Sequence, residues 1–163
     1  MDFWMFDRRS FENDLLNLFS ALGDLQYEYD WVISDHEVWY AERCPDAVRT
    51  RWQWTGLLMD GAELTEHLRS GYVSFVGGGV LSAVPKGTEQ SRVDRFTPFW
   101  EHEDLFTSKY RFQTPLTQLE LICYDGDWLL VCEPSFSAYV RTLPQAQTSE
   151  EHFAFDVRTP CNP

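Results

Sequence analysis

The stretch at residues 117–133, TQLELICYDGDWLLVCE, decides the fold because two alternating apolar runs meet at Asp125-Gly126. Asp-Gly between such runs is a strong signal for a two-residue hairpin turn. This turn sets Tyr124 opposite Asp127 and thereby fixes the register of both strands. One face of the hairpin is then wholly apolar; it consists of Leu119, Leu121, Cys123, Trp128, Leu130 and Cys132.

The second face of this hairpin mixes polar and apolar side chains. It carries Gln118, Glu120, Ile122, Tyr124, Leu129, Val131 and Glu133. An apolar face belongs on a core, whereas a mixed face is typical of a surface that is only partly covered. The hairpin is therefore predicted to be a scaffold element, and it carries no evident chemistry.

Periodicity extends this scaffold to the rest of the chain. Helices are predicted over residues 11–22, 61–69 and 135–143, with Asp60 as the N-cap of the second helix and Gly71 at its end. Strands are predicted over residues 27–33, 36–42, 52–59 and 72–84, the last of them interrupted by a bulge at Gly77-Gly78-Gly79. Residues 44–51 are predicted to be a loop. The sequence thus predicts a single α+β domain over residues 1–163, with a mostly antiparallel sheet of about five to seven strands and two or three helices.

The charge balance narrows the range of partners. The chain has 13 Lys and Arg against 26 Asp and Glu, a formal net charge of −13. This field repels phosphate backbones and anionic lipids, so direct binding to nucleic acid or to a membrane surface is disfavoured. It favours a cationic protein partner and speeds the encounter with it. An acidic surface that only keeps the protein soluble is the alternative explanation.

Two sequence features bear on the compartment. The first residues, MDFWMFDRRS, place acids and arginines inside an apolar run, which is not the pattern of a signal peptide. The longest weakly charged run, at residues 72–85, is too short and too rich in glycine to span a bilayer. We therefore expect a cytoplasmic protein.

No motif in the chain specifies a reaction. The triple glycine lacks the Lys-Ser/Thr pair of a phosphate-binding loop, and the histidines and cysteines match no recognised metal pattern. We predict no catalytic residues, no metal site and no cofactor. A small-ligand-binding protein or an enzyme of unrecognised type remains the alternative, with His36, Glu37 and His102 as its first candidates.

Acidic residues gather between positions 24 and 46, where seven acids stand against one base. Aromatic side chains interleave with them, and an acidic face with nearby aromatic anchors suits protein binding. The predicted strand at residues 27–33 places Glu28 and Asp30 on the same side. We predict a partner-binding surface that consists of Glu28, Asp30, Asp35, Glu37 and Trp39. A solvated outer face of a sheet, with its aromatic residues turned inward, would give the same pattern.

Three stretches resemble small acidic immunity proteins of bacterial toxin systems: residues 52–61 (WQWTGLLMDG), 79–85 (GVLSAVP) and 119–131 (LELICYDGDWLLV). These stretches are structural, so the resemblance assigns no binding residues. It implies a tight, non-catalytic inhibitor of one cognate toxin domain, often a basic nuclease. A subunit or adaptor whose aromatic residues cover an interface, including a homodimer interface, is the third hypothesis.

Overall fold

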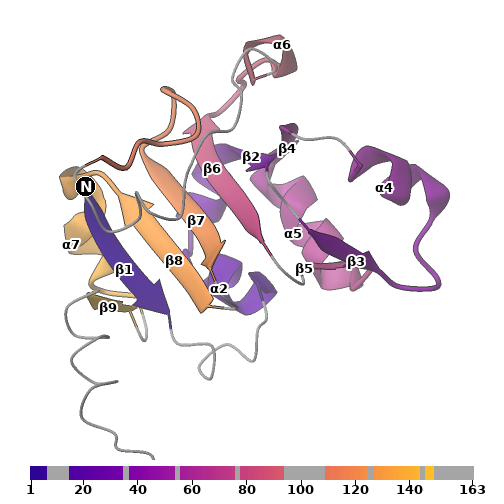
Figure 1. Ribbon diagram of the computed structural model, residues 1–163, viewed down its shortest axis with the longest axis horizontal. Helices are drawn as coiled ribbons and strands as arrows, with labels where there is room; N and C mark the ends of the chain where they lie inside the picture. The colour runs from indigo at the N-terminus through magenta and orange to yellow at the C-terminus, as the bar shows by residue number, and fades with distance from the viewer. Residues whose placement is uncertain are drawn as a thin grey trace, which may run out of the picture.

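The computed structural model describes residues 1–6, 15–34, 37–53, 56–75, 78–93, 109–124, 127–143 and 146–148. Within these residues, one antiparallel sheet has the strand order β4-β2-β6-β7-β8-β1-β9 (Figure 1). We call it the main sheet, and it confirms the predicted α+β fold. Its strands are β1 (Asp2–Phe6), β2 (Tyr29–Ser34), β4 (Leu57–Asp60), β6 (Gly79–Pro85), β7 (Leu119–Tyr124), β8 (Asp127–Cys132) and β9 (Ala146–Thr148).

The central hairpin forms in the predicted register. Tyr124 pairs with Asp127, Cys123 with Trp128 and Leu119 with Cys132. The predicted apolar face lies on the largest core cluster, where Cys123 and Cys132 are buried free thiols. The second face is more deeply covered at its centre than predicted, because Glu120, Ile122, Leu129 and Val131 are fully buried, whereas Gln118 is exposed and Glu133 is half-buried.

Two helices of seven and ten residues accompany the main sheet, α2 (Leu15–Ala21) and α5 (Gly61–Ser70). The caps of α5 are as predicted: the Asp60 carboxylate accepts a hydrogen bond of 2.9 Å from the Glu63 N–H, and Gly71 ends the helix with a φ of 64°. Shorter helical turns are α3 (Leu25–Glu28), α4 (Asp46–Arg51), α6 (Gln90–Val93), the 3-10 turn η2 (Pro134–Phe136) and α7 (Ser137–Val140).

The start of α5 lies directly against the backbone of α3. A Cβ atom at Gly61 would lie 1.6 Å from the carbonyl oxygen of Gln26, so no other side chain fits there without moving one of the two helices. The same Gln26 oxygen accepts a hydrogen bond of 3.1 Å from the indole N–H of Trp31. This contact fixes α5 relative to β2.

Both faces of the main sheet are covered. One face packs against α2, α5 and α7 through a cluster that includes Phe19, Trp31 and Leu64; Phe19 and Trp31 meet edge to face at 4.8 Å. On the opposite face, Tyr110 and Phe112 pack on β6, β7 and β8, and Val93 of α6 packs near β2. The main sheet is therefore an interior layer.

A second, two-stranded sheet pairs β3 (Val38–Tyr40) with β5 (Val73–Phe75), and we call it the arm (Figure 1). The arm continues the β2–β6 pair, because β2 leads into β3 and β5 leads into β6. Two connections join the pair Ser34–Val80 to the pair Val38–Phe75. The connection between β2 and β3 has three residues (35–37), and the connection between the paired residues of β5 and β6 has four (76–79). Of the three glycines at the predicted interruption, Gly77 lies outside the described residues, Gly78 lies between β5 and β6, and Gly79 already pairs with Cys123 as the first residue of β6.

Several local predictions need correction. Residues 27 and 28 belong to α3, so the strand begins only at Tyr29. Residues 46–51 form α4 instead of a loop, and β4 begins at Leu57 instead of at residue 52. The N-terminal residues form β1, which lies between β8 and β9. The first four residues of the helix predicted at 11–22 lie outside the described residues.

Candidate partner-binding surface

The structure separates the five residues of the predicted binding surface. Glu28 is exposed at the end of α3, whereas Glu37 and Trp39 are exposed beyond the other end of β2. Because β2 has six residues, these two locations are roughly 20 Å apart. Asp35 lies outside the described residues. The expectation that Glu28 and Asp30 share one side of a strand is wrong, because Glu28 is helical.

Asp30 is buried and bonds to the turn that follows β6. Its carboxylate accepts a hydrogen bond of 2.6 Å from the Gly87 N–H. The Lys86 ammonium group lies 3.7 Å from the same carboxylate. Asp30 therefore holds the turn that follows β6, and it presents almost no surface to a partner.

Glu37 and Trp39 come together on the arm. Trp39 is 55% exposed, more than any other large apolar side chain among the described residues. It pairs with Ser74 across the arm, while its neighbours Val38 and Tyr40 pack partly against the core. Alternation along β3 therefore turns Trp39 outward, and Glu37, which directly precedes β3, is also exposed.

Arginines hold the segment after β3 in place. Arg49 donates hydrogen bonds of 2.8 Å to the Ala41 carbonyl and 3.2 Å to the Cys44 carbonyl, and its guanidinium lies 5.3 Å from the centre of the Tyr40 ring. Arg43 donates to the Ser70 carbonyl at 3.4 Å. Sequence reasoning assigned no role to these arginines, because their partners are backbone carbonyls that no side-chain pattern reveals.

The acids of the same segment have no such partners. Glu37, Glu42 and Asp46 are exposed, and none of them makes an ion pair among the described residues. In contrast, Arg51 lies within ion-pair distance of Glu63, at 2.5 Å. The arm therefore presents one exposed tryptophan and carboxylates that remain open to a partner.

A second acidic and aromatic area surrounds α3. Asp24, Tyr27 and Glu28 are exposed, and Tyr139 of α7 donates a hydrogen bond of 2.5 Å to the Leu22 carbonyl beside them. Partial burial and then the nearby charges of Asp24 and Glu28 raise the pKa of Tyr139. This area belongs to the acidic segment found in the sequence, but it lies at the opposite end of β2 from Trp39.

A buried carboxyl group lies on the face of the main sheet that is opposite the helices. Glu120 has no exposed surface and accepts hydrogen bonds of 2.7 Å from the Ser82 hydroxyl and 2.7 Å from the Gln113 N–H, and a further one from the Tyr110 hydroxyl. Burial raises the pKa of Glu120 to about 7, and the three hydrogen bonds oppose that shift. No substrate can reach this carboxyl, so its role is to fix residues 109–118 on the sheet.

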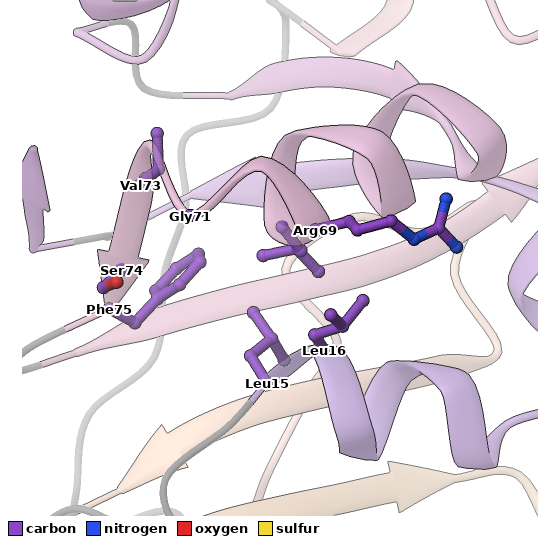
Figure 2. Close-up of a pocket in the computed structure, with 8 residues that line it drawn as sticks. Leu15, Leu16, Arg69, Gly71, Val73, Ser74 and Phe75 are labelled. Atoms are coloured by element: carbon purple, nitrogen blue, oxygen red, sulfur yellow. The ribbon is translucent and has the colours of Figure 1, made fainter. Parts of the chain in front are cut away.

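One cavity of about 310 Å³ lies between β5, α2 and the end of α5 (Figure 2). Its polar side chains are Arg69 and Ser74, and the rest of its side-chain lining is apolar. His36 and His102, the candidates of the enzyme alternative, lie outside the described residues, and Glu37 does not line this cavity.

His67 also has structural contacts. Its Nδ1 atom accepts a hydrogen bond of 2.9 Å from the indole N–H of Trp52, and its Nε2 atom is 3.9 Å from the Glu63 carboxylate. Burial lowers the pKa of His67, so the ring is neutral at pH 7. In the part of the chain that the structure describes, no three His, Cys, Asp or Glu side chains group as metal ligands would, and no helix there is long and apolar enough to cross a membrane.

Comparisons with protein-family models, with curated proteins and with solved structures found no match to this chain.

Proposed function

We propose that the protein is a non-catalytic binding module that captures a cationic protein, and that it acts as an immunity-type inhibitor of a basic bacterial toxin domain. The observation that carries this proposal is Trp39, an exposed tryptophan on the outer face of the arm. Tryptophan is the residue type most enriched at the energetic centre of protein interfaces. The resemblance to immunity proteins supplies the inhibitory role.

The charges of the chain support a cationic partner both at long range and in direct contact. The net charge of −13 attracts a basic protein from beyond contact and raises its association rate. Close to the arm the balance is different, because residues 37–53 carry three acids and three arginines. Since those arginines bond to the chain's own carbonyls and to Glu63, the open carboxylates of Glu37, Glu42 and Asp46 are left to meet the partner.

The experiment is affinity capture from a lysate of the source cells, with the tagged protein washed at about 0.05 M and then about 0.5 M salt. We expect one basic partner in a fixed ratio, retained by the wild type and lost with Trp39→Ala. A tryptophan at the centre of an interface contributes about 2 kcal/mol or more, so the dissociation constant should rise at least about thirtyfold. The double variant Glu37→Gln/Glu42→Gln should slow association and weaken its dependence on salt.

Tyr27→Ala is the matched control, because Tyr27 is also an exposed aromatic residue (46%) but lies on α3, away from the arm. It should leave capture unchanged. The partner's own activity is then measured with and without an equimolar amount of this protein, and inhibition is the expected result. Equal capture by wild type and Trp39→Ala would contradict the proposal, as would a partner that remains fully active in the complex.

A further inference from the structure

The arm has two outer edges, one on β3 and one on β5, and no described strand pairs along either of them. β5 pairs with β3 along its first edge, and no described strand pairs along its second. The Ala41 N–H bonds to the Tyr72 carbonyl at 3.0 Å, which marks this position as a hydrogen-bonded pair of the ladder. Such pairs alternate along antiparallel strands, so Val73 and Phe75 direct their N–H and C=O groups away from β3. Two donors and two acceptors therefore line the second edge at the spacing of a strand.

The cavity of about 310 Å³ borders this same edge. All three residues of β5 line it, together with Leu15 and Leu16 of α2 and Leu68 of α5. Figure 2 shows Phe75, Leu15 and Leu16 around this space, with Arg69 extending to one side. Free backbone groups and an apolar recess for a side chain therefore lie next to each other.

The outer edge of β4 shows how the same molecule protects an edge. The Gln90 side chain accepts a hydrogen bond of 3.1 Å from the Leu58 N–H and donates one of 2.9 Å to the Gly56 carbonyl. The Arg51 guanidinium lies 3.5 Å from the Leu58 carbonyl. Side chains thus occupy the groups that another strand would need, which is a common protection of edge strands. None of the described residues does this for Val73 or Phe75.

We propose that the second edge of β5 receives an extended segment of the partner protein, which adds as a strand and places an apolar side chain in the cavity. The proposal deepens the proposed function and rests on it for the identity of the partner. Strand addition gives affinity through main-chain hydrogen bonds and specificity through pockets for alternate side chains. Pairing between the β5 edges of two copies is disfavoured, because each of these edges borders its own α2 and α5.

The test uses the full-length protein, isotopically labelled for NMR, and a defined peptide as the probe. The probe is the capped heptapeptide Lys-Thr-Leu-Thr-Leu-Thr-Lys, in which the leucines share one face of a strand. We expect a dissociation constant below about 1 mM, with shifts confined to β5, α2 and the end of α5. Exchange of the Val73 and Phe75 amide hydrogens should slow at least about tenfold, while that of Trp39, already bonded within the ladder, should not change.

Three matched peptides separate the contribution of the apolar side chains from that of the main-chain hydrogen bonds. Replacement of both leucines by glutamate should weaken binding at least about tenfold, because the cavity is apolar. N-methylation of both leucines in one peptide, and of all three threonines in another, removes these donors from one strand edge at a time while it keeps the side chains, and one of these two peptides should lose binding. Equal binding of both methylated peptides would overturn strand addition, as would shifts elsewhere on the protein or no shifts at about 2 mM peptide.

Variants of the protein make this test independent of the proposed function. Leu16→Trp should fill the cavity and abolish peptide binding, whereas Leu16→Met, its conservative control, should retain it. Trp39→Ala should bind the peptide as the wild type does. Retained binding by Leu16→Trp would count against the cavity, even if Trp39-dependent capture succeeds. Peptide binding without any captured partner would support the edge and count against the immunity-type function.

Discussion

The two faces of the main sheet are both buried, but apolar contacts dominate on one face and hydrogen bonds to a carboxyl group dominate on the other. Toward α2 and α5 the contacts are apolar side chains around Trp31, whose single polar atom is bonded to the Gln26 carbonyl. On the other face, residues 109–118 form no helix or strand. Glu120 accepts two hydrogen bonds from this segment, from Tyr110 and Gln113, and a third from Ser82 of β6. Hydrophobic burial has no direction and tolerates small errors, whereas a buried carboxyl needs every donor in place.

The polar face also carries groups that remain unsatisfied. Among the described residues, both polar atoms of the Gln113 side chain and the Thr117 hydroxyl are buried without a hydrogen-bond partner, whereas the helix-covered cluster has one such atom, the indole nitrogen of Trp4. Buried polar atoms without partners cost stability, and an apolar core contains very few of them. The helix-covered face should therefore contribute more to the free energy of unfolding, and the polar face should give that free energy its dependence on pH.

The largest expected effect is on the helix-covered face. Trp31→Ala should lower the free energy of unfolding by about 3–5 kcal/mol, because it removes a fully buried indole and its contact with Phe19. Urea unfolding at pH 7, followed by circular dichroism, gives the value. A loss below about 1 kcal/mol would show that this face is not the main source of stability.

A smaller effect, with a definite sign, is expected for Glu120→Gln. Burial raises the pKa of Glu120 from 4.5 to about 7, so between these values the folded protein holds a proton that the unfolded chain has lost. Stability should therefore fall as the pH rises through this window and should level off above it. The glutamine variant has no such proton, so between pH 4.5 and pH 8 the wild type should lose roughly 3 kcal/mol relative to it.

The measurement is a series of urea unfolding curves for wild type and variant at several pH values. Only the difference between the two proteins is used, because the other carboxylates contribute equally to both. A difference that does not depend on pH would mean that Glu120 titrates at the same pH in the folded and unfolded states.

The smallest of the three effects is expected for Tyr110→Phe. The substitution removes one donor to Glu120 and keeps the ring, which packs against Phe3 and Phe112. We expect a loss of about 1–2 kcal/mol at pH 8, where Glu120 is ionised, and a smaller loss at pH 5. Phe112→Leu changes the same cluster without touching the carboxyl, so its cost should be the same at both pH values.

The apolar half of this comparison could be read from the sequence. The hairpin register followed from Asp125-Gly126, and its core face followed from strict alternation. The caps of α5 followed from Asp60 and Gly71, since capping depends on residues only three or four positions apart. Local rules succeed where the decisive contacts are local.

The rest could not be read in this way because its partners are distant in sequence. Asp30 is buried by a turn 57 residues away, and Glu120 is matched by Ser82, 38 residues away. Alternation at residues 27–33 favoured a strand, but the one-turn helix α3 takes its first residues. The predicted surface therefore divided into α3, a buried carboxylate and the arm, of which only Glu37 and Trp39 stayed together.

The offset of one residue between the arm and the main sheet also decides which side chains the arm displays. In β2 the odd-numbered residues Trp31 and Ile33 enter the core, whereas in β3 the even-numbered residues Val38 and Tyr40 face it and Trp39 faces out. The number of residues between the paired segments, more than the identity of those residues, therefore decides which side chains of β3 are exposed. A single insertion or deletion between β2 and β3 would exchange the two sets, hide the tryptophan and expose its neighbours, so the length of this connection decides which side chains reach the surface.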